Sequence, residues 1–215
     1  MDRRALALGV YVVTSGDLVK GRGHREVALA AIEGGATAVQ LRAPELEDPS
    51  LLPLATELAR ACREAGVLLL VNDRLDVARQ SGAHGVHLGQ EDELEGARER
   101  LGPDRVLGIS VTSPPEALAA EGTGADYLGV TVWATATKPE ARAVGLDGLR
   151  AVVETTSLPV VGIGGIHAGN AAEVLAAGAA GIAVVSAVGS APDPVEATRG
   201  LVEIVRSGMR EDGAR

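Results

Sequence analysis

Two aspartates in this sequence have a side chain and a position that suit a chemical role. Asp73 and Asp92 each follow a short apolar run, and the amides Asn72 and Gln90 lie close to them in the chain. Carboxylate oxygens are the ligands expected for Mg²⁺, which keeps several waters and bridges to substrate phosphates. Aspartate after a strand is also a common helix N-cap, and Asp73 could cap a helix that starts near Leu75. The pair therefore predicts a magnesium site, with helix capping as the alternative for either residue alone.

Three further segments have residue types that suit phosphate groups. Residues 161–166 are rich in glycine, and Val185-Ser186 ends another apolar run. Loops of this kind bind phosphate through backbone N–H groups at helix starts. The segment Thr135-Ala136-Thr137-Lys138-Pro139 supplies hydroxyls and an ammonium group, which also suit phosphate oxygens. Its alternative interpretation is an ordinary solvated loop.

Other polar residues leave their roles open at this stage. Arg42 could bind a phosphate with its guanidinium fork, or it could pair with Glu45 or Glu47. His87 ends an apolar run, where a packed interior residue is more common than a base. Cys62 is the only cysteine, and a small core residue is its expected role.

Eight short apolar runs must position these residues. They are Val10–Thr14, Ala38–Leu41, Val67–Val71, Gly85–Leu88, Val106–Ser110, Tyr127–Val130, Pro159–Ile163 and Gly181–Val185. Continuous apolar runs are typical of parallel strands buried on both faces. Amphipathic stretches lie between them at residues 25–33, 51–65, 115–120, 146–154, 170–177 and 194–206. The strands recur about every 24 residues, which predicts a (β/α)₈ TIM barrel. An open doubly wound sheet is the alternative.

The predicted barrel is a single α/β domain over residues 1–215, with a frayed polar tail from about residue 208. A Gly-Ala pair precedes every second strand, as expected for a barrel built from repeated units. Functional residues of such barrels gather at the carboxyl ends of the strands. Polar or glycine residues follow seven of the eight runs, so we expect one site at that rim.

Composition excludes several classes of function. The formal net charge is −9, whereas a general nucleic-acid binder is usually basic. No apolar stretch approaches the roughly 18 residues of a membrane span. One cysteine allows no intrachain disulfide, and no signal peptide is predicted, so a cytoplasmic location is expected. The expected partners are small molecules, without nucleic acid or membrane, and a homo-oligomer is compatible with the sequence.

The assembled motifs resemble those of the thiamine-phosphate synthase family, over nearly the whole chain from Val10 to about Val205. The motifs that carry the resemblance are Gln40-Leu41-Arg42, Val71-Asn72-Asp73, His87-Leu88-Gly89-Gln90-Glu91-Asp92, Gly108-Ile109-Ser110, Thr135-Ala136-Thr137-Lys138-Pro139, Gly162-Ile163-Gly164-Gly165-Ile166 and Val185-Ser186. The resemblance implies a transferase of thiamine biosynthesis. Such an enzyme joins a hydroxymethylpyrimidine diphosphate to a thiazole phosphate and releases diphosphate through a pyrimidine-stabilised cation.

The resemblance also implies roles for individual residues. Asp73 and Asp92 would hold Mg²⁺ on the leaving diphosphate. The pyrimidine diphosphate would contact Gln40, Arg42, Asn72, Ser110 and Lys138, of which Arg42, Ser110 and Lys138 are the catalytic candidates. The thiazole phosphate would contact Thr135, Thr137, Gly165, Val185 and Ser186.

The sequence departs from the family pattern at two places. Pro44 stands where the family has a lysine, so one cation for the diphosphate is missing. The loss of one charge-assisted contact costs about 1.5–3 kcal/mol. Arg22 or Lys20 are candidates to replace it. The segment after the sixth strand, which begins at Thr131, is altered and one residue shorter than in the family.

Three other functions are compatible with the barrel. The TenI-like thiazole tautomerases bind the same thiazole phosphate, but their catalytic histidine falls on Thr131 here. The Asp73 and Asp92 pair would also have no purpose in a metal-free isomerisation. A non-catalytic binder of thiazole phosphate is a further alternative, and an unrelated sugar-phosphate epimerase is a weaker one. The synthase therefore ranks first.

Overall fold

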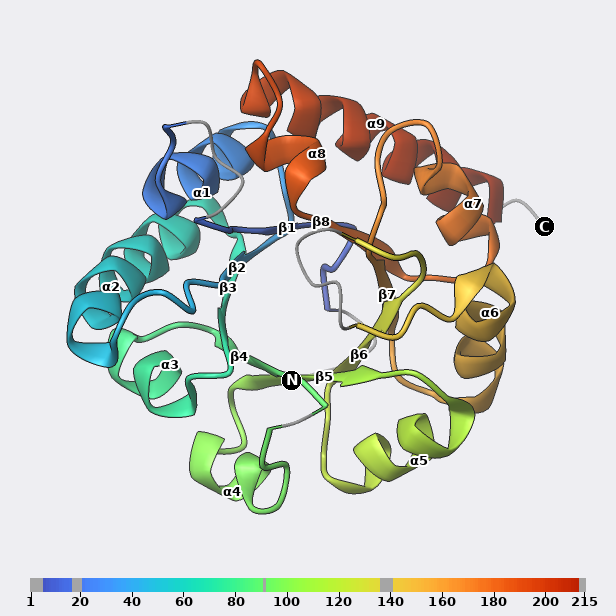
Figure 1. Cartoon of the computed structure of the whole chain (residues 1–215), viewed down its shortest axis with the longest axis horizontal. Coiled ribbons are helices and arrows are strands. Elements are labelled where there is room, and N and C mark those ends of the chain that lie inside the picture. The colour runs from blue at the N-terminus through green and yellow to red at the C-terminus, as the bar shows by residue number, and fades with distance from the viewer. Residues whose placement is uncertain (1–5, 17–20, 91, 136–140, 213–215) are drawn as a thin grey trace.

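The structure is a computed structural model that describes residues 6–16, 21–90, 92–135 and 141–212. Eight parallel strands close into a barrel in the order of the sequence, and the last strand pairs with the first. Figure 1 shows the strands as an inner ring with the helices around them. The predicted (β/α)₈ barrel is confirmed, and the open doubly wound sheet is excluded because both edges of the sheet are paired.

All eight apolar runs form strands, each within one residue of the expected bounds. The strands are β1 Val10–Val13, β2 Ala38–Leu41, β3 Leu68–Asn72, β4 Gly85–Leu88, β5 Val106–Val111, β6 Tyr127–Thr131, β7 Val160–Ile163 and β8 Gly181–Val184. The helices are α1 His24–Glu33, α2 Asp48–Ala65, α3 Leu75–Ser81, α4 Ala97–Leu101, α5 Pro114–Gly122, α6 Gly145–Thr155, α7 Ala171–Ala176, α8 Ser186–Gly189 and α9 Pro194–Asp212.

Helix α9 continues to Asp212, about six residues beyond the amphipathic stretch that the sequence indicated, and into the segment predicted as a frayed tail. The apolar face of α9 explains the extra turn, because Leu201 and Val205 are buried and Gly208 lies against Leu175 of α7. None of the helices in the described part of the chain is both long enough and apolar enough to cross a membrane.

Two separate layers of side chains stabilise the barrel. The larger cluster lies between the strands and the surrounding helices. The smaller one, centred on Tyr11, Leu70 and Tyr127, fills the inside of the barrel. Alternate residues of each strand point inward, as in other closed parallel barrels. The barrel is therefore a packed core that presents its open end, at the carboxyl ends of the strands, to ligands.

Gly181, the first residue of β8, provides a test of this packing. A Cβ atom at Gly181 would lie 1.8 Å from the backbone carbonyl oxygen of Leu8. Backbone cannot move as a flexible side chain can, so we expect Gly181→Ala to lower the free energy of unfolding by about 3 kcal/mol. Chemical denaturation measures this change.

The matched control is Gly200→Ala on α9, where a Cβ would have no atom within 4 Å. Alanine inside a helix is more stable than glycine by about 0.5–1 kcal/mol. If the two variants were equally stable, the close approach of β8 to Leu8 would be ruled out.

Candidate active site

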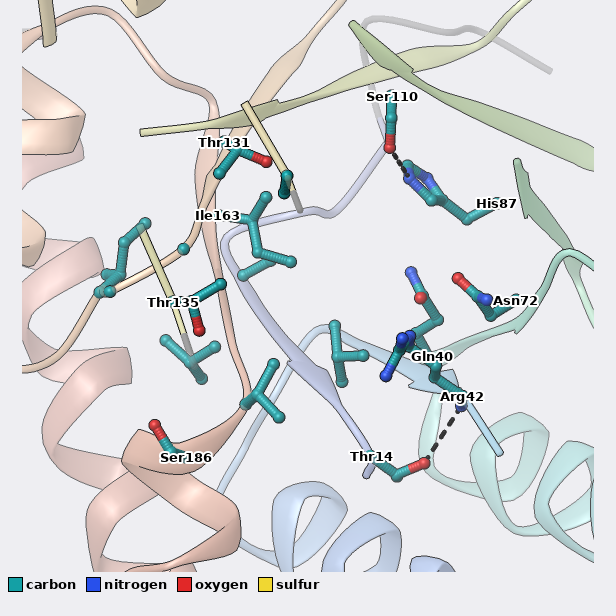
Figure 2. Close-up of a pocket in the computed structure, with 18 residues that line it drawn as sticks. Thr14, Gln40, Arg42, Asn72, His87, Ser110, Thr131, Thr135, Ile163 and Ser186 are labelled. Atoms are coloured by element: carbon teal, nitrogen blue, oxygen red, sulfur yellow. Dashed lines mark hydrogen bonds between the residues drawn. The ribbon is translucent and has the colours of Figure 1, made fainter. Parts of the chain in front are cut away.

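A pocket opens at the carboxyl ends of the strands, where the sequence predicted the site. Figure 2 shows the residues that line it, which come from most strands of the barrel. Eight of the predicted substrate-binding residues lie on its wall, namely Gln40, Arg42, Asn72, Ser110, Thr135, Gly165, Val185 and Ser186. The other two, Thr137 and Lys138, lie outside the described residues.

The wall has two chemically different halves. Gln40, Arg42 and Asn72, from β2 and β3, lie together on one side of Figure 2. The opposite side carries Ile163, the last residue of β7, and Ser186, the first residue of α8 after β8. One half is therefore rich in amide and guanidinium donors, and the other combines apolar side chains with glycine backbone and hydroxyl groups.

The guanidinium of Arg42 is available to a ligand. It forms no ion pair with any residue that the structure describes, and the backbone N–H of Arg42 donates to Thr14 Oγ1 at 3.2 Å. Glu45, which the sequence offered as a partner, instead accepts a hydrogen bond from His24 Nε2 at 2.5 Å. The geometry thus favours the phosphate-binding interpretation of Arg42 over the pairing with Glu45.

His24 connects this rim to the first strand. Its Nδ1 lies 2.8 Å from Thr14 Oγ1, and the ring is buried at the start of α1. Burial alone would raise the pKa of Glu45, but the hydrogen bond from His24 and the nearby charge of Arg42 hold this pKa below its usual value. Glu45 is therefore an anion that fixes His24, and His24 in turn fixes the end of β1.

Asp73 lies directly after β3 in an unusual backbone conformation. It has a φ of 60°, the only positive φ among the non-glycine residues described. Its backbone N–H donates to the His87 carbonyl at 2.9 Å, and its Oδ2 accepts from Asn72 Nδ2 at 2.5 Å. The N-cap residue of α3 is Arg74, so capping by Asp73 is not the reason for its position. Left-handed backbone at a non-glycine residue often marks a functional site.

Asp92 lies in the loop after β4. Its Oδ2 accepts the backbone N–H of Gly89 at 2.6 Å, while its Oδ1 accepts no hydrogen bond from the residues described. Gln90 does not accompany it, because the Gln90 amide donates to Glu116 Oε2 on α5 at 2.8 Å. Neither Asp73 nor Asp92 is part of the pocket wall.

The carboxylates of Asp73 and Asp92 are of the donor type that Mg²⁺ prefers in sites where phosphates and waters complete its coordination. Both are hard oxygen donors oriented by a neighbouring N–H group. No group of three or more His, Cys, Asp or Glu side chains suited to a metal occurs within the described ranges.

The glycine-rich loop after β7 has free backbone donors at the pocket wall. Gly164 and Gly165 have φ values of 90° and 63°, and a Cβ at Gly164 would lie 2.5 Å from the Trp133 carbonyl oxygen. Asn170 Nδ2 donates to the Gly165 carbonyl at 3.0 Å and holds the loop in this shape. The N–H groups of both glycines lack an acceptor in the described structure, and such groups suit a phosphate.

Sequence reasoning missed Thr14 and did not foresee the second role of His87. Thr14 directly follows β1 and lines the pocket, and the rule that polar residues follow strands would have found it. His87 packs inside the barrel as predicted, but its ring also lines the pocket and its Nε2 lies 2.9 Å from Ser110 Oγ. Its position resulted from barrel closure, which the sequence alone does not give in atomic detail.

Arg22 does not replace the missing lysine at position 44. Its Nη1 and Nη2 donate to the carbonyls of Ala191 and Pro192 at 2.5 and 2.8 Å. Lys20, the other candidate, lies outside the described residues. Pro44 itself is exposed and lies two residues after Arg42, which lines the pocket.

Comparisons with known proteins agree with this geometry. Residues 10–188 match the sequence model of the thiamine monophosphate synthase family. The chain is 50% identical over 202 residues to a thiamine-phosphate synthase of Natronomonas pharaonis, covering 92% of this chain and 94% of that one. It is also 50% identical over 198 residues to a thiamine-phosphate synthase of Chloroflexus aurantiacus, covering 91% and 92%.

A solved structure extends the similarity to the fold. The thiamine phosphate pyrophosphorylase of Pyrococcus furiosus superposes with a TM-score of 0.87 at 43% identity, covering 94% of this chain and 98% of that chain. Matched motifs, pocket and fold therefore all agree, and this chain belongs to the thiamine monophosphate synthase family.

Proposed function

We propose that this protein joins a hydroxymethylpyrimidine diphosphate to a thiazole phosphate, forming thiamine phosphate and diphosphate. The observation that carries the proposal is the two-sided pocket. Gln40, Arg42 and Asn72, implied for the pyrimidine diphosphate, line one half, and Thr135 and Ser186, implied for the thiazole phosphate, line the other. Relatives that are half identical to this chain are thiamine-phosphate synthases, which supports the same reaction.

In this reaction the bond between the pyrimidine methylene carbon and the diphosphate oxygen breaks, and its electron pair leaves with the diphosphate. The thiazole ring nitrogen then supplies the electron pair of the new C–N bond. Such a reaction needs stabilisation of the leaving charge and alignment of two ligands more than it needs a strong base.

The residues of the proposed site divide these tasks. Arg42 and Lys138 provide positive charge for the diphosphate oxygens, and Gln40, Asn72 and Ser110 provide hydrogen bonds that orient the pyrimidine diphosphate. On the other half, Gly165 offers a backbone N–H to the thiazole phosphate. Thr135, Thr137, Val185 and Ser186 complete that half of the proposed site.

Asp73 and Asp92 are the proposed Mg²⁺ ligands. When bound, the ion neutralises charge on the diphosphate as it leaves. The hydrogen bonds from Asn72 and Gly89 hold the two carboxylates in place for this role.

A tautomerase would need a proton-transfer group where Thr131 lines the pocket. A threonine hydroxyl does not titrate near neutral pH, so the synthase is the better proposal. The experiment supplies the purified protein with both substrates, with each alone, and with the thiazole phosphate isomer that a tautomerase would use. Thiamine phosphate that forms only with both substrates supports the synthase. Isomerisation without coupling would overturn it.

Pro44 gives a second test of the proposed diphosphate site. Pro44→Lys would restore a cation beside Arg42, and a charge-assisted contact of about 1.5 kcal/mol corresponds to a gain of roughly tenfold in kcat/KM for the pyrimidine diphosphate. Steady-state kinetics measure the gain. The control is Pro49→Lys, an exposed position at the start of α2, which should leave kcat/KM unchanged. An equal effect of both variants would show that added charge, and not its place, is responsible.

The remaining proposals concern partners and location. We propose that the protein acts on small molecules in the cytoplasm, without nucleic acid, and that a homo-oligomer is compatible with this function. The net charge of −9 and the presence of a single cysteine support these proposals.

A further inference from the structure

Five polar side chains form a continuous hydrogen-bonded chain through the inside of the barrel. Gln40 Nε2 donates to the Tyr11 hydroxyl at 2.7 Å, and the Tyr11 and Tyr127 hydroxyls lie 3.0 Å apart. The Tyr127 hydroxyl lies 2.8 Å from His87 Nδ1, and His87 Nε2 lies 2.9 Å from Ser110 Oγ. We call these five residues the tyrosine relay. Its two ends, Gln40 and Ser110, line the pocket, while both tyrosines are fully buried.

The barrel makes room for the tyrosine relay at two glycines. A Cβ at Gly108 of β5 would lie 2.2 Å from the ring of Tyr127, and one at Gly129 of β6 would lie 3.1 Å from the ring of His87. The tyrosine rings themselves meet edge to face, with centroids 6.1 Å apart. Apolar packing in this cluster needs the rings but not their hydroxyl groups. Hydroxyl groups buried in apolar surroundings are costly unless each has a partner, which points to a role for the hydrogen-bonded chain.

The donors and acceptors of the tyrosine relay can be matched in one direction along the chain of hydrogen bonds. Burial raises the pKa of both Tyr11 and Tyr127 above the usual value, so each hydroxyl keeps its hydrogen. Tyr11 already accepts from Gln40, and its only other partner is Tyr127, so Tyr11 must donate to Tyr127. The second partner of Tyr127 is His87 Nδ1, so Tyr127 must donate there.

The direction continues to the pocket. Because His87 Nδ1 accepts from Tyr127, the ring hydrogen lies on Nε2 and is donated to Ser110 Oγ. The hydroxyl hydrogen of Ser110 is then left for the pocket, where it has no acceptor within the residues described. At the other end, Gln40 uses its amide nitrogen on Tyr11, and its carbonyl oxygen accepts no hydrogen bond from the residues described.

We propose that Tyr11 and Tyr127 are positioning residues that make Ser110 a hydrogen-bond donor, and Gln40 an acceptor, toward the pyrimidine diphosphate. This proposal rests on the function proposed above. The substrate must therefore present an acceptor atom to Ser110 and a donor group to Gln40. Reversing the direction of the chain would leave the Tyr11 hydrogen without an acceptor, so one arrangement is strongly preferred.

The direct test is the tautomer of His87, which can be read without any substrate. In ¹⁵N NMR of the labelled full chain, we expect the wild-type His87 ring to carry its hydrogen on Nε2. The signals are assigned by their loss in His87→Gln. In Tyr127→Phe, which removes the donor to Nδ1, this preference should weaken. A wild-type ring with its hydrogen on Nδ1 would overturn the proposed direction.

A kinetic double-mutant cycle tests the positioning role. Tyr127→Phe should lower kcat/KM for thiamine phosphate formation by about tenfold, but by less than about twofold when Ser110→Ala is already present. A purely structural role of Tyr127 would give the same loss in both backgrounds, and that result would overturn the proposal. Tyr11→Phe should follow the same pattern.

The control separates positioning from stability. Thr198→Val on α9 also removes a buried hydroxyl, which donates to the Pro194 carbonyl at 2.7 Å, but it lies outside the barrel interior. It should lower the melting temperature and leave kcat/KM unchanged. A wild-type protein that forms no thiamine phosphate would refute the proposed function. The NMR result would then still decide the direction of the tyrosine relay.

Discussion

Replacing Asp92 by asparagine should lower kcat/KM for thiamine phosphate formation by at least about 100-fold. The loss of one group that stabilises developing charge in a reaction costs about 10²–10³ in rate. Asparagine keeps an oxygen that can accept the Gly89 N–H, so the loop after β4 should retain its shape. What Asp92→Asn removes is the negative charge that would bind Mg²⁺. Steady-state kinetics over a range of Mg²⁺ concentrations measure the effect, and excess Mg²⁺ should restore part of the activity.

The matched control is Glu93→Gln, one residue further along the same loop. Glu93 is exposed, and its replacement removes the same unit of charge. We expect its activity to remain within about twofold of the wild type, as surface charges beyond direct contact are largely screened. If Asp92→Asn were as active as Glu93→Gln, Asp92 would have no part in metal binding or in the reaction.

The second large effect, a loss of stability, is expected when Arg98 is replaced, at the end of the barrel opposite the pocket. Arg98 of α4 donates to the carbonyls of Gly102, Arg105 and Gly124, and pairs with Asp126 at 2.5 Å. Asp126 precedes β6, and its carboxylate also accepts the backbone N–H of Leu107 on β5 at 2.8 Å. A single guanidinium thus connects α4 to the start of two neighbouring strands.

Arg98→Ala should therefore lower the free energy of unfolding by about 3 kcal/mol, the low end of the cost of removing one partner from a buried ion pair, because the two side chains remain 22% and 12% exposed. At this chain length the melting temperature should fall by roughly 10 °C. Arg100→Ala is the control, because the Arg100 side chain is 50% exposed and pairs with Asp76 only at 3.6 Å. It should change the stability by less than about 1 kcal/mol. Calorimetry showing equal melting temperatures for the two variants would contradict this account of Arg98.

The strands could be predicted because each is buried on both faces and is therefore apolar throughout. Because the strands alternate with helices, a barrel could be predicted as well. The predicted barrel placed Gln40, Asn72 and Ser110 on one rim. The short helices α4 and α8, of five and four residues, are too short for helical periodicity to show in the sequence. Helix α9 extends further than predicted because Gly208 packs against Leu175, a contact between distant segments.

The details of the site depend on contacts that only the closed barrel creates. Tyr11 and Tyr127 are 116 residues apart in the chain, and nothing in the sequence near either one indicates a hydrogen bond between them. The contacts of Arg22 are likewise not indicated by the nearby sequence. Its guanidinium donates to backbone carbonyls after α8 instead of facing the proposed diphosphate site. Residue type and strand position were enough to find the pocket wall. The partner of each side chain was not predictable at that level.

The most direct test of the central claim measures diphosphate and thiamine phosphate together. The purified protein receives both substrates, once with Mg²⁺ and once with excess EDTA. We expect one diphosphate released for each thiamine phosphate formed with Mg²⁺, and neither product with EDTA. Product formation that is equally fast in EDTA would contradict the proposed roles of Asp73 and Asp92. An absence of both products with Mg²⁺, despite binding of the thiazole phosphate, would contradict the proposed function itself.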